Sequence, residues 1–210
     1  MNSPFDKLFE NEAQIPEAFR VQFLTGADEG VDVVLEGVMN IWYRPRWLFP
    51  LLWAAEKMGV LLSEQGEGIP ARLVMRTVRD KKGRPVQYWN RAFQFSRERY
   101  FNTVLKYMPE IDDVVEYVGP GKLVGAAWFV EYRPPGTLVF NSELGPVRMA
   151  GRAFWLPKLL RRWLLGVIRF KQRVDGQNPA KTHIEMVVHH PLLGDVFGYN
   201  GVFEIRKQTR

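Results

Sequence analysis

Hydrophobic and polar residues alternate in short stretches along most of the chain, and turns rich in glycine and proline separate these stretches. Residues 31–43, for example, are rich in β-branched and aromatic residues, which is typical of a β-strand. Comparable strands are expected at 69–79, 85–96, 100–107, 113–118, 123–133, 138–141, 147–154, 167–174, 182–189 and 196–205. Strands in series that are joined by tight turns pair antiparallel. About ten such strands must protect their edges, so the pattern predicts a mainly β protein whose sheet is strongly curved or closes as a lipocalin-like barrel.

Three stretches show helical features instead of strand alternation. Residues 1–26 are expected to form a helical lead-in, and helices are expected near 46–58, after the first strand, and near 157–165. The helix over 50–58 is apolar almost all round, with only Glu56 and Lys57 as exceptions. Such a helix is buried, or lies in a bilayer interface, or packs on a partner, and burial against the concave sheet is the interpretation we favour. We expect one domain over residues 1–210, with the barrel spanning 31–206.

The composition narrows the class of protein. The chain has no cysteine, which excludes a disulfide scaffold, thiol catalysis and thiolate metal sites. The longest unbroken apolar run, residues 47–55, has nine residues, whereas a membrane-spanning helix needs about 18. No basic region followed by an apolar stretch opens the sequence, so no signal peptide is expected and a cytoplasmic location is predicted.

The positive charge is concentrated in one part of the chain. The net charge is +6, and residues 144–174 hold eight basic residues and no acidic one. In the expected helix at 157–165, Lys158, Arg161 and Arg162 line one face, and Trp163 belongs to the other. This pattern suits peripheral contact with an anionic membrane or with an acidic protein, and it also suits an ordinary solvated face. Nucleic acid is not expected as a partner, because no helix-turn-helix, RNA-recognition or zinc-module signature is present.

Several segments occur together in a characteristic order. They are SPFDKLF, IPEAFRVQFLTG, LEGVMNIW, WNRAFQF, YFNTVL, VEYVGP, LPKLL and HHPLLGDVFGYNGVF, and together they resemble the bacterial domain-of-unknown-function family 4166 over nearly the whole chain. The resemblance implies a self-contained module, since members of that family are also attached to saccharopine-dehydrogenase-like domains or occur within YndJ-like proteins. It supplies no catalytic residues. This chain also lacks the glycine fingerprint of a dinucleotide-binding fold.

The strand at 86–96 carries the most informative residue. Trp89, Arg91 and Phe93 share its apolar face, so Arg91 is expected to point into the barrel. A buried charge must be paired or must meet a ligand, and Glu116, which lies between two valines on its own face, is the expected partner. Arg91 is therefore a candidate anchor for a carboxylate or phosphate. The alternatives are a purely structural Arg91–Glu116 pair, or an arginine at the mouth of the barrel.

The histidines and one tyrosine complete the candidate ligand-binding residues. His189 is a candidate cavity residue, and His189 or His190 is a candidate general base, although no nucleophile motif accompanies either one. His183 and His189 lie about 20 Å apart along one strand, so they cannot share a metal ion unless the strand bends sharply. Tyr199 is expected at a bend or bulge near the cavity rather than as a catalytic tyrosine. No metal and no cofactor are expected.

We therefore expect noncatalytic binding of a hydrophobic, anionic small molecule or lipid inside the barrel, with Arg91 holding its head group. One alternative is an enzyme that acts on a small acid in the same cavity, using Arg91, Glu116 and one histidine. That version requires these groups to converge on one point. The other alternative is an interaction module that docks an acidic partner through residues 144–174, which predicts salt-sensitive binding and an interior filled by side chains.

Overall fold

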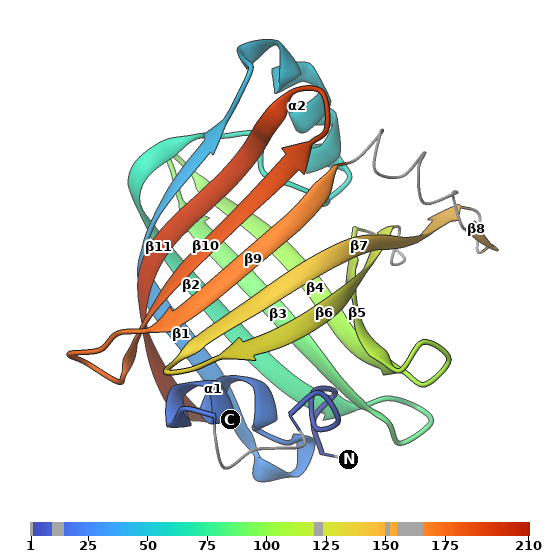
Figure 1. Cartoon of the computed structure of the whole chain (residues 1–210), viewed down its shortest axis with the longest axis vertical. Coiled ribbons are helices and arrows are strands. Elements are labelled where there is room, and N and C mark those ends of the chain that lie inside the picture. Colours follow the sequence, from blue (N-terminus) through green and yellow to red (C-terminus); the bar gives the residue numbers. More distant parts are fainter. Residues whose placement is uncertain (1, 10–14, 120–123, 150–151, 155–165) are drawn as a thin grey trace.

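Ten antiparallel strands close into a barrel in the computed structural model, which describes residues 2–9, 15–119, 124–149, 152–154 and 166–210 (Figure 1). The strands are β1 (Val31–Tyr43), β2 (Gly66–Arg79), β3 (Pro85–Gln94), β4 (Glu98–Met108), β5 (Asp113–Val118), β6 (Val124–Arg133), β7 (Thr137–Met149), β9 (Val167–Val174), β10 (Lys181–His190) and β11 (Gly194–Thr209). An additional short strand, β8 (Arg152–Phe154), pairs with the end of β7 outside the ring. The prediction of a mainly antiparallel β-barrel is confirmed.

Neighbouring strands follow one another in sequence around most of the ring. The order is β6-β5-β4-β3-β2-β1-β11-β10-β9-β7, and β7 returns to β6 to close it. The first and last strands pair along their full shared length, from Val31 opposite Thr209 to Tyr43 opposite Phe197. Their backbones approach closely at Gly37, where a Cβ atom would lie 1.9 Å from the carbonyl oxygen of Val202. In the closed ring, each of the ten strands pairs with a neighbouring strand on both sides.

Side chains alternate between the barrel interior and its outer surface. On β3, Gln87, Trp89, Arg91 and Phe93 are buried, whereas Tyr88 is exposed. On β10, Ile184, Met186 and Val188 belong to the core. This alternation is the two-residue period of a strand that has one buried face and one solvent-exposed face.

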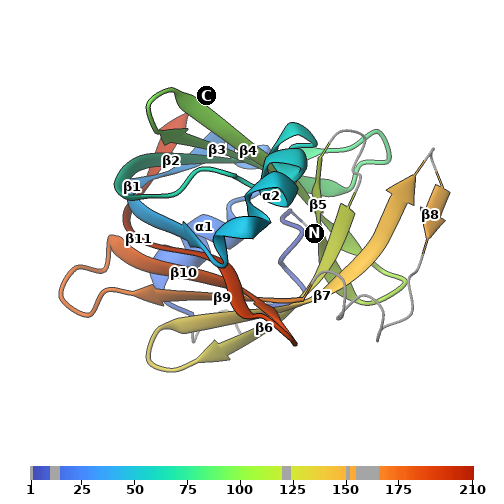
Figure 2. The same ribbon diagram turned by 90° about the horizontal axis from the view of Figure 1, so that it is seen from above.

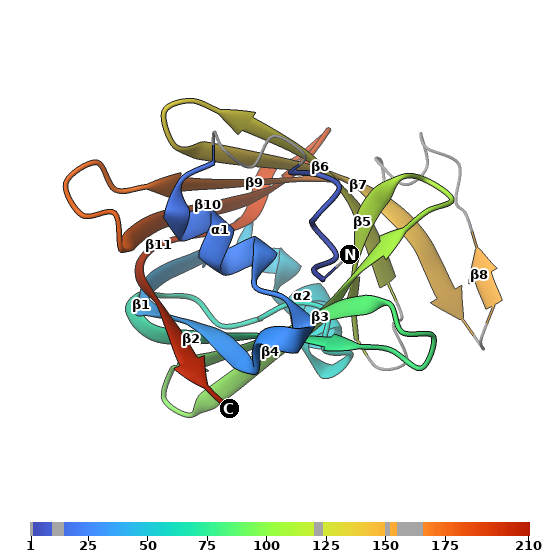
Figure 3. The same ribbon diagram turned by 90° about the horizontal axis from the view of Figure 1, so that it is seen from below.

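The N-terminal segment closes the lower end of the barrel (Figure 3). The helix α1 (Glu17–Leu24) contributes Phe19 and Phe23 to the core, and the turns before it contribute Phe5 and Phe9. All four rings are buried, and the Phe5 and Phe23 rings pack edge to face at 5.1 Å. Residues 4–9 form turns, so among the described residues of the expected lead-in only α1 is helical, and the short η2 (Ala27–Glu29) follows it.

Buried glutamines fix this segment to the strands. Gln22 on α1 and Gln172 on β9 exchange two side-chain hydrogen bonds, one of them at 3.2 Å. Gln87 on β3 donates to the Gln22 carbonyl at 3.4 Å and accepts from the Trp89 indole N–H at 2.6 Å. These amides are buried, so their mutual hydrogen bonds determine how α1 sits in the barrel.

The helix α2 (Phe49–Lys57), preceded by η3 (Arg46–Leu48), covers the opposite end (Figure 2). As predicted, a helix follows the first strand and packs on the barrel. However, its expected burial in the concave sheet is wrong, because Leu52 is the only buried residue of α2 and Leu48 the only one of η3. The connection leaves β1 at Tyr43 and re-enters the ring at Gly66 on the neighbouring strand. Both ends of the segment are thus tied to one rim, so the helix lies across the opening rather than inside it.

One expected turn is absent. The Leu144-Gly145-Pro146 sequence predicts a break in the chain, but β7 continues through it to Met149. The register between β6 and β7 shifts instead, because Ala126 pairs with Leu144 and Val124 with Val147. Proline has no N–H to donate to the neighbouring strand, and a bulge accommodates it within the sheet.

Candidate ligand-binding cavity

The barrel holds a cavity of about 190 Å³, lined by its strands and by the connection that follows α2. Its wall is almost wholly apolar, and the exceptions are Arg91, Glu116 and Tyr199. The other lining residues are Val60, Leu61, Leu62, Trp89, Phe93, Phe101, Leu105, Val118, Val124, Gly125, Ala126, Trp128, Phe140, Ile168, Phe170, Met186, Val188 and Phe197. Five of the six residues predicted to bind a ligand therefore line one space, while their role in binding stays a prediction.

Arg91 and Glu116 form a buried ion pair in the wall of this cavity. The Arg91 Nη2 donates to Glu116 Oε1 at 3.2 Å, and its Nη1 donates to Thr103 Oγ1 at 3.1 Å. The expected Arg91–Glu116 contact is thus present. The guanidinium also lies over two aromatic rings, 4.9 Å from the centroid of Trp89 and 5.0 Å from that of Phe101.

Both oxygens of the Glu116 carboxylate already accept a hydrogen bond. Its Oε2 accepts a hydrogen bond from Trp128 Nε1 at 3.0 Å, while Oε1 accepts from Arg91. Arg91, in contrast, uses two of its five N–H groups in side-chain hydrogen bonds to described residues. The pair is neutral overall, and it retains donors but no unused carboxylate oxygen.

Tyr199 on β11 supplies a second donor. Burial raises the pKa of Tyr199 to about 12, so its phenol is protonated at neutral pH. Within the described part of the chain its hydroxyl has no hydrogen-bond partner. The expected bend is absent, because residues 199–201 pair in regular register with β1, and a register shift lies instead between Val188 and His189.

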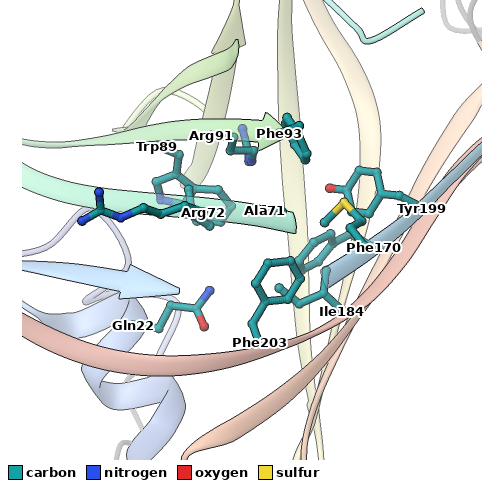
Figure 4. Close-up of a pocket in the computed structure, with 12 residues that line it drawn as sticks. Gln22, Ala71, Arg72, Trp89, Arg91, Phe93, Phe170, Ile184, Tyr199 and Phe203 are labelled. Atoms are coloured by element: carbon teal, nitrogen blue, oxygen red, sulfur yellow. The ribbon is translucent and has the colours of Figure 1, made fainter. Parts of the chain in front are cut away.

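A smaller space of about 30 Å³ adjoins this cavity and shares residues with it (Figure 4). Trp89, Arg91 and Phe93 come from β3 and Tyr199 from β11, and Gln22 of α1 lines the lower side. This volume is about that of a single water molecule. The interior is thus closed at the α1 end and hollow at the α2 end.

His189 is outside the barrel, contrary to its predicted place in the cavity. Its Nδ1 lies 2.8 Å from Asp195 Oδ1 at the outer surface, and its side chain is 41% exposed. His183 shares the outer face of β10 and contacts Asp175 at 2.9 Å. His190 does not line the cavity. The acid–base arrangement of Arg91, Glu116 and a histidine is therefore not assembled among the described residues.

The predicted membrane or partner surface is only partly visible. Lys158, Arg161, Arg162 and Trp163, together with the expected helix at 157–165, lie outside the described residues. From the same basic stretch, Arg169, Lys171 and Arg173 on β9 are exposed. None of these three cations forms an ion pair within the part of the chain that the structure describes.

Sequence reasoning missed several cavity residues. Trp128, which binds Glu116, shares its strand face with Ala126, whereas the exposed Phe129 belongs to the other face. A usable sequence signal for Trp128 was that the charged Glu131 and Arg133 share the face of Phe129, which leaves Trp128 on the more apolar face. Nothing in the local sequence indicates that Val60 and Leu62, in the connection after α2, reach the same space.

Two further features bear on the chemistry available. No three histidine, aspartate or glutamate side chains gather closely enough to hold a metal ion in the described ranges. Among the same residues, no helix is long and apolar enough to cross a membrane.

Comparisons with known proteins identify the family but no activity. No functionally curated protein matches the sequence. Among solved structures, the chain is similar to an inactive mutant of the CurJ dehydratase in complex with Compound 21, at 10% identity and a TM-score of 0.24, over 89% of this chain and 77% of that one. It is also similar to a putative thioesterase II from Thermobifida fusca YX, at 10% identity and a TM-score of 0.25, over 98% of this chain and 86% of that one. Both TM-scores are too low for either likeness to bear on fold or function.

The family assignment rests on a match over most of the barrel. The family model described as "Domain of unknown function (DUF4166)" matches residues 15–203, from just before α1 to within β11. This range includes the whole cavity wall described above. The chain belongs to the DUF4166 family.

Proposed function

We propose that the barrel binds a small, mostly apolar molecule that carries one neutral hydrogen-bond acceptor. The observation that carries the proposal is a hollow, apolar interior whose wall presents donors at Arg91 and Tyr199. Ligand pockets are usually apolar with a few placed polar groups of this kind. Binding of this sort needs no catalytic group.

The volume supports a small ligand. A cavity of about 190 Å³ is slightly larger than one that holds benzene, and it is smaller than the pockets that take drug-sized molecules. A molecule of about ten non-hydrogen atoms suits this space. A complete long-chain fatty acid exceeds it.

The charge balance favours a neutral head group over the anionic one expected from the sequence. Because Glu116 neutralises Arg91, an ionised carboxylate would leave the cavity with a net negative charge in an apolar surrounding. A carbonyl, amide or ester oxygen accepts hydrogen bonds from Tyr199 and Arg91 without this penalty. The ion pair then serves as a rigid, neutral donor group.

Octanamide and octanoate provide a direct test, because they have the same number of non-hydrogen atoms and differ in charge at neutral pH. Titration monitored by tryptophan fluorescence is suitable, since Trp89 and Trp128 line the cavity. We expect octanamide to bind more tightly than octanoate, and Tyr199→Phe to weaken octanamide binding roughly three- to tenfold. Tyr88→Phe, on the outer face of the barrel, is the matched control and should leave the affinity unchanged.

A filled cavity gives an independent check. Ala126→Leu adds apolar volume to the cavity wall and should abolish octanamide binding while the protein stays folded. Native mass spectrometry of freshly purified protein, followed by organic extraction, would identify a retained molecule. Failure of wild-type protein to bind either compound, together with a clean apo mass, would refute the proposal.

A second candidate function rests on the exposed cations of β9. Arg169, Lys171 and Arg173 point outward on one strand, and an acidic partner protein would complement them. This function predicts binding that weakens steeply with salt and is lost in an Arg169→Gln/Arg173→Gln variant.

A further inference from the structure

The outward face of α2 is apolar and exposed to an unusual degree. Trp47, Leu51 and Trp53 are 64%, 65% and 52% exposed, and Phe49 and Met58 are exposed beside them. Large exposed apolar patches on a soluble domain mark sites that bind something else. The turn between β10 and β11, with Leu192 and Leu193 also exposed, lies at the same end of the barrel (Figure 1).

Contacts on the inward side fix which face of the helix is presented. Leu48 and Leu52 are buried in the core. Glu56, the one acidic residue in α2, accepts a hydrogen bond from the Ser63 N–H at 3.1 Å and lies 3.5 Å from Arg99. The acid is therefore held at the barrel side, and the outward face of α2 carries no negative charge.

Cations flank this apolar face at both ends. Arg44 and Arg46 are exposed just before the helix, and Lys57 is exposed at its end, with its Nζ 5.7 Å from the Trp53 ring centroid. None of the three cations forms an ion pair among the described residues. Tryptophan side chains between basic residues on an exposed apolar helix are typical of segments that lie in the interface of an anionic bilayer.

We propose that the outward face of α2 docks the barrel on an anionic lipid bilayer. Trp47, Leu51 and Trp53 enter the headgroup boundary, and Arg44, Arg46 and Lys57 pair with lipid phosphates. Val60 and Leu62, in the segment after α2, line the cavity, so docking brings the hollow end of the barrel to the membrane. The bilayer is then the source of the apolar ligand, a step that rests on the proposed function, whereas the docking itself does not.

Flotation with lipid vesicles tests the docking. We expect the protein to float with vesicles of phosphatidylcholine mixed with phosphatidylglycerol and not with phosphatidylcholine alone. A Leu51→Glu/Trp53→Glu variant should lower the bound fraction more than about tenfold, and each of Arg44→Gln, Arg46→Gln and Lys57→Gln should lower the affinity roughly fivefold. Both positions of the first variant are exposed, so its circular dichroism and melting temperature should match those of wild type.

Phe129→Glu is the matched control, because Phe129 is 53% exposed on β6 and lies outside the patch. It should float as wild type does. The proposal is overturned if the wild-type protein floats with neither vesicle, if it floats equally with both, or if Leu51→Glu/Trp53→Glu floats undiminished. Self-association of wild-type protein that the same variant abolishes, without flotation, would assign the patch to a second copy of the chain and would also overturn it.

Octanamide titration in solution separates the two proposals. The Leu51→Glu/Trp53→Glu variant should bind octanamide with wild-type affinity, since neither residue lines the cavity. If this variant loses flotation but still binds octanamide, the docking surface is shown to act independently of the cavity. Flotation without any octanamide binding supports docking and counts against the cavity proposal.

Discussion

The Arg91–Glu116 pair can be removed one side chain at a time or as a unit, and the two outcomes should differ strongly. Arg91→Leu leaves the Glu116 carboxylate buried, with the Trp128 N–H as its remaining side-chain hydrogen-bond donor among the described residues. Glu116→Leu leaves a buried guanidinium whose remaining side-chain hydrogen bond is to Thr103. Breaking a buried pair by removing one partner lowers the free energy of unfolding by about 3–5 kcal/mol. We expect each single variant to fall in this range.

The double variant Arg91→Leu/Glu116→Leu should be much less destabilised than the sum of the two. Both buried charges are gone, and the remaining penalty is the Trp128 N–H that no longer has its acceptor. An unsatisfied buried donor costs about 1–3 kcal/mol, and the added leucine side chains offset part of this. The double variant should therefore lose about 1–3 kcal/mol, several kcal/mol less than an additive result.

The wild type, the two single variants and the double variant form a double-mutant cycle. Urea unfolding, monitored by circular dichroism, measures the free energy of unfolding of each protein in it. Arg133 and Glu131 on β6 form an exposed pair at 2.8 Å and provide a control cycle, whose coupling should stay below about 1 kcal/mol. A loss of under about 1 kcal/mol in Arg91→Leu would show that the pair is solvated and would refute the reasoning. If the folded double variant binds octanamide as wild type does, Arg91 is not an anchor and the pair is structural.

Two other perturbations test the packing and the electrostatics. Gln172→Leu leaves the buried Gln22 amide without its partner, so it should lower the free energy of unfolding, measured in urea, by about 2–4 kcal/mol. The control Ser142→Ala removes a buried hydroxyl that has no partner among the described residues, and it should change the free energy of unfolding by less than about 1 kcal/mol. Burial raises the pKa of Asp113 to about 6, so the folded state holds this proton more tightly than the unfolded chain does. The free energy of unfolding of the wild type should therefore fall by about 2 kcal/mol as the pH rises from about 4 to about 6. Asp113→Asn should lack this loss, and it should match wild type at pH about 4 and exceed it at pH about 7 in parallel urea titrations.

The sequence predicted those parts of the cavity wall that follow from the alternation of side chains within a single strand. On β3 the two-residue period is regular, and the residues that share the apolar face with Arg91 are buried in the structure. The same rule could have excluded His189, since it alternates with Val188 and Ile184, which point inward, and shares its face with Glu185. The more apolar face of β10 is the inner one.

Other parts of the site depend on contacts that no local pattern contains. Trp128 meets Glu116 because β5 and β6 pair in one register, and Tyr199 faces the cavity because β11 pairs with β1 and β10 within the ring. The position of α2 also depends on the closed ring. Its apolar composition suited burial, but its two ends are tied to a single rim, so most of its side chains remain outside.

The two ends of the barrel differ in how much they resist opening, and this difference indicates where a ligand enters. At the lower end, Phe5, Phe9, Phe19 and Phe23 are buried, and exposing four such rings costs about 6–12 kcal/mol before the Gln22 hydrogen bonds are counted. At the upper end, lifting the helical segment exposes Leu48 and Leu52, which costs about 3–6 kcal/mol before the contacts of Glu56 with Ser63 and Arg99 are counted. A bilayer that receives the outward face of α2 also offers an apolar surrounding to these two leucines and lowers that cost further. Exchange of a ligand is therefore easiest at the α2 end, where the cavity lies and where the exposed patch would meet a membrane.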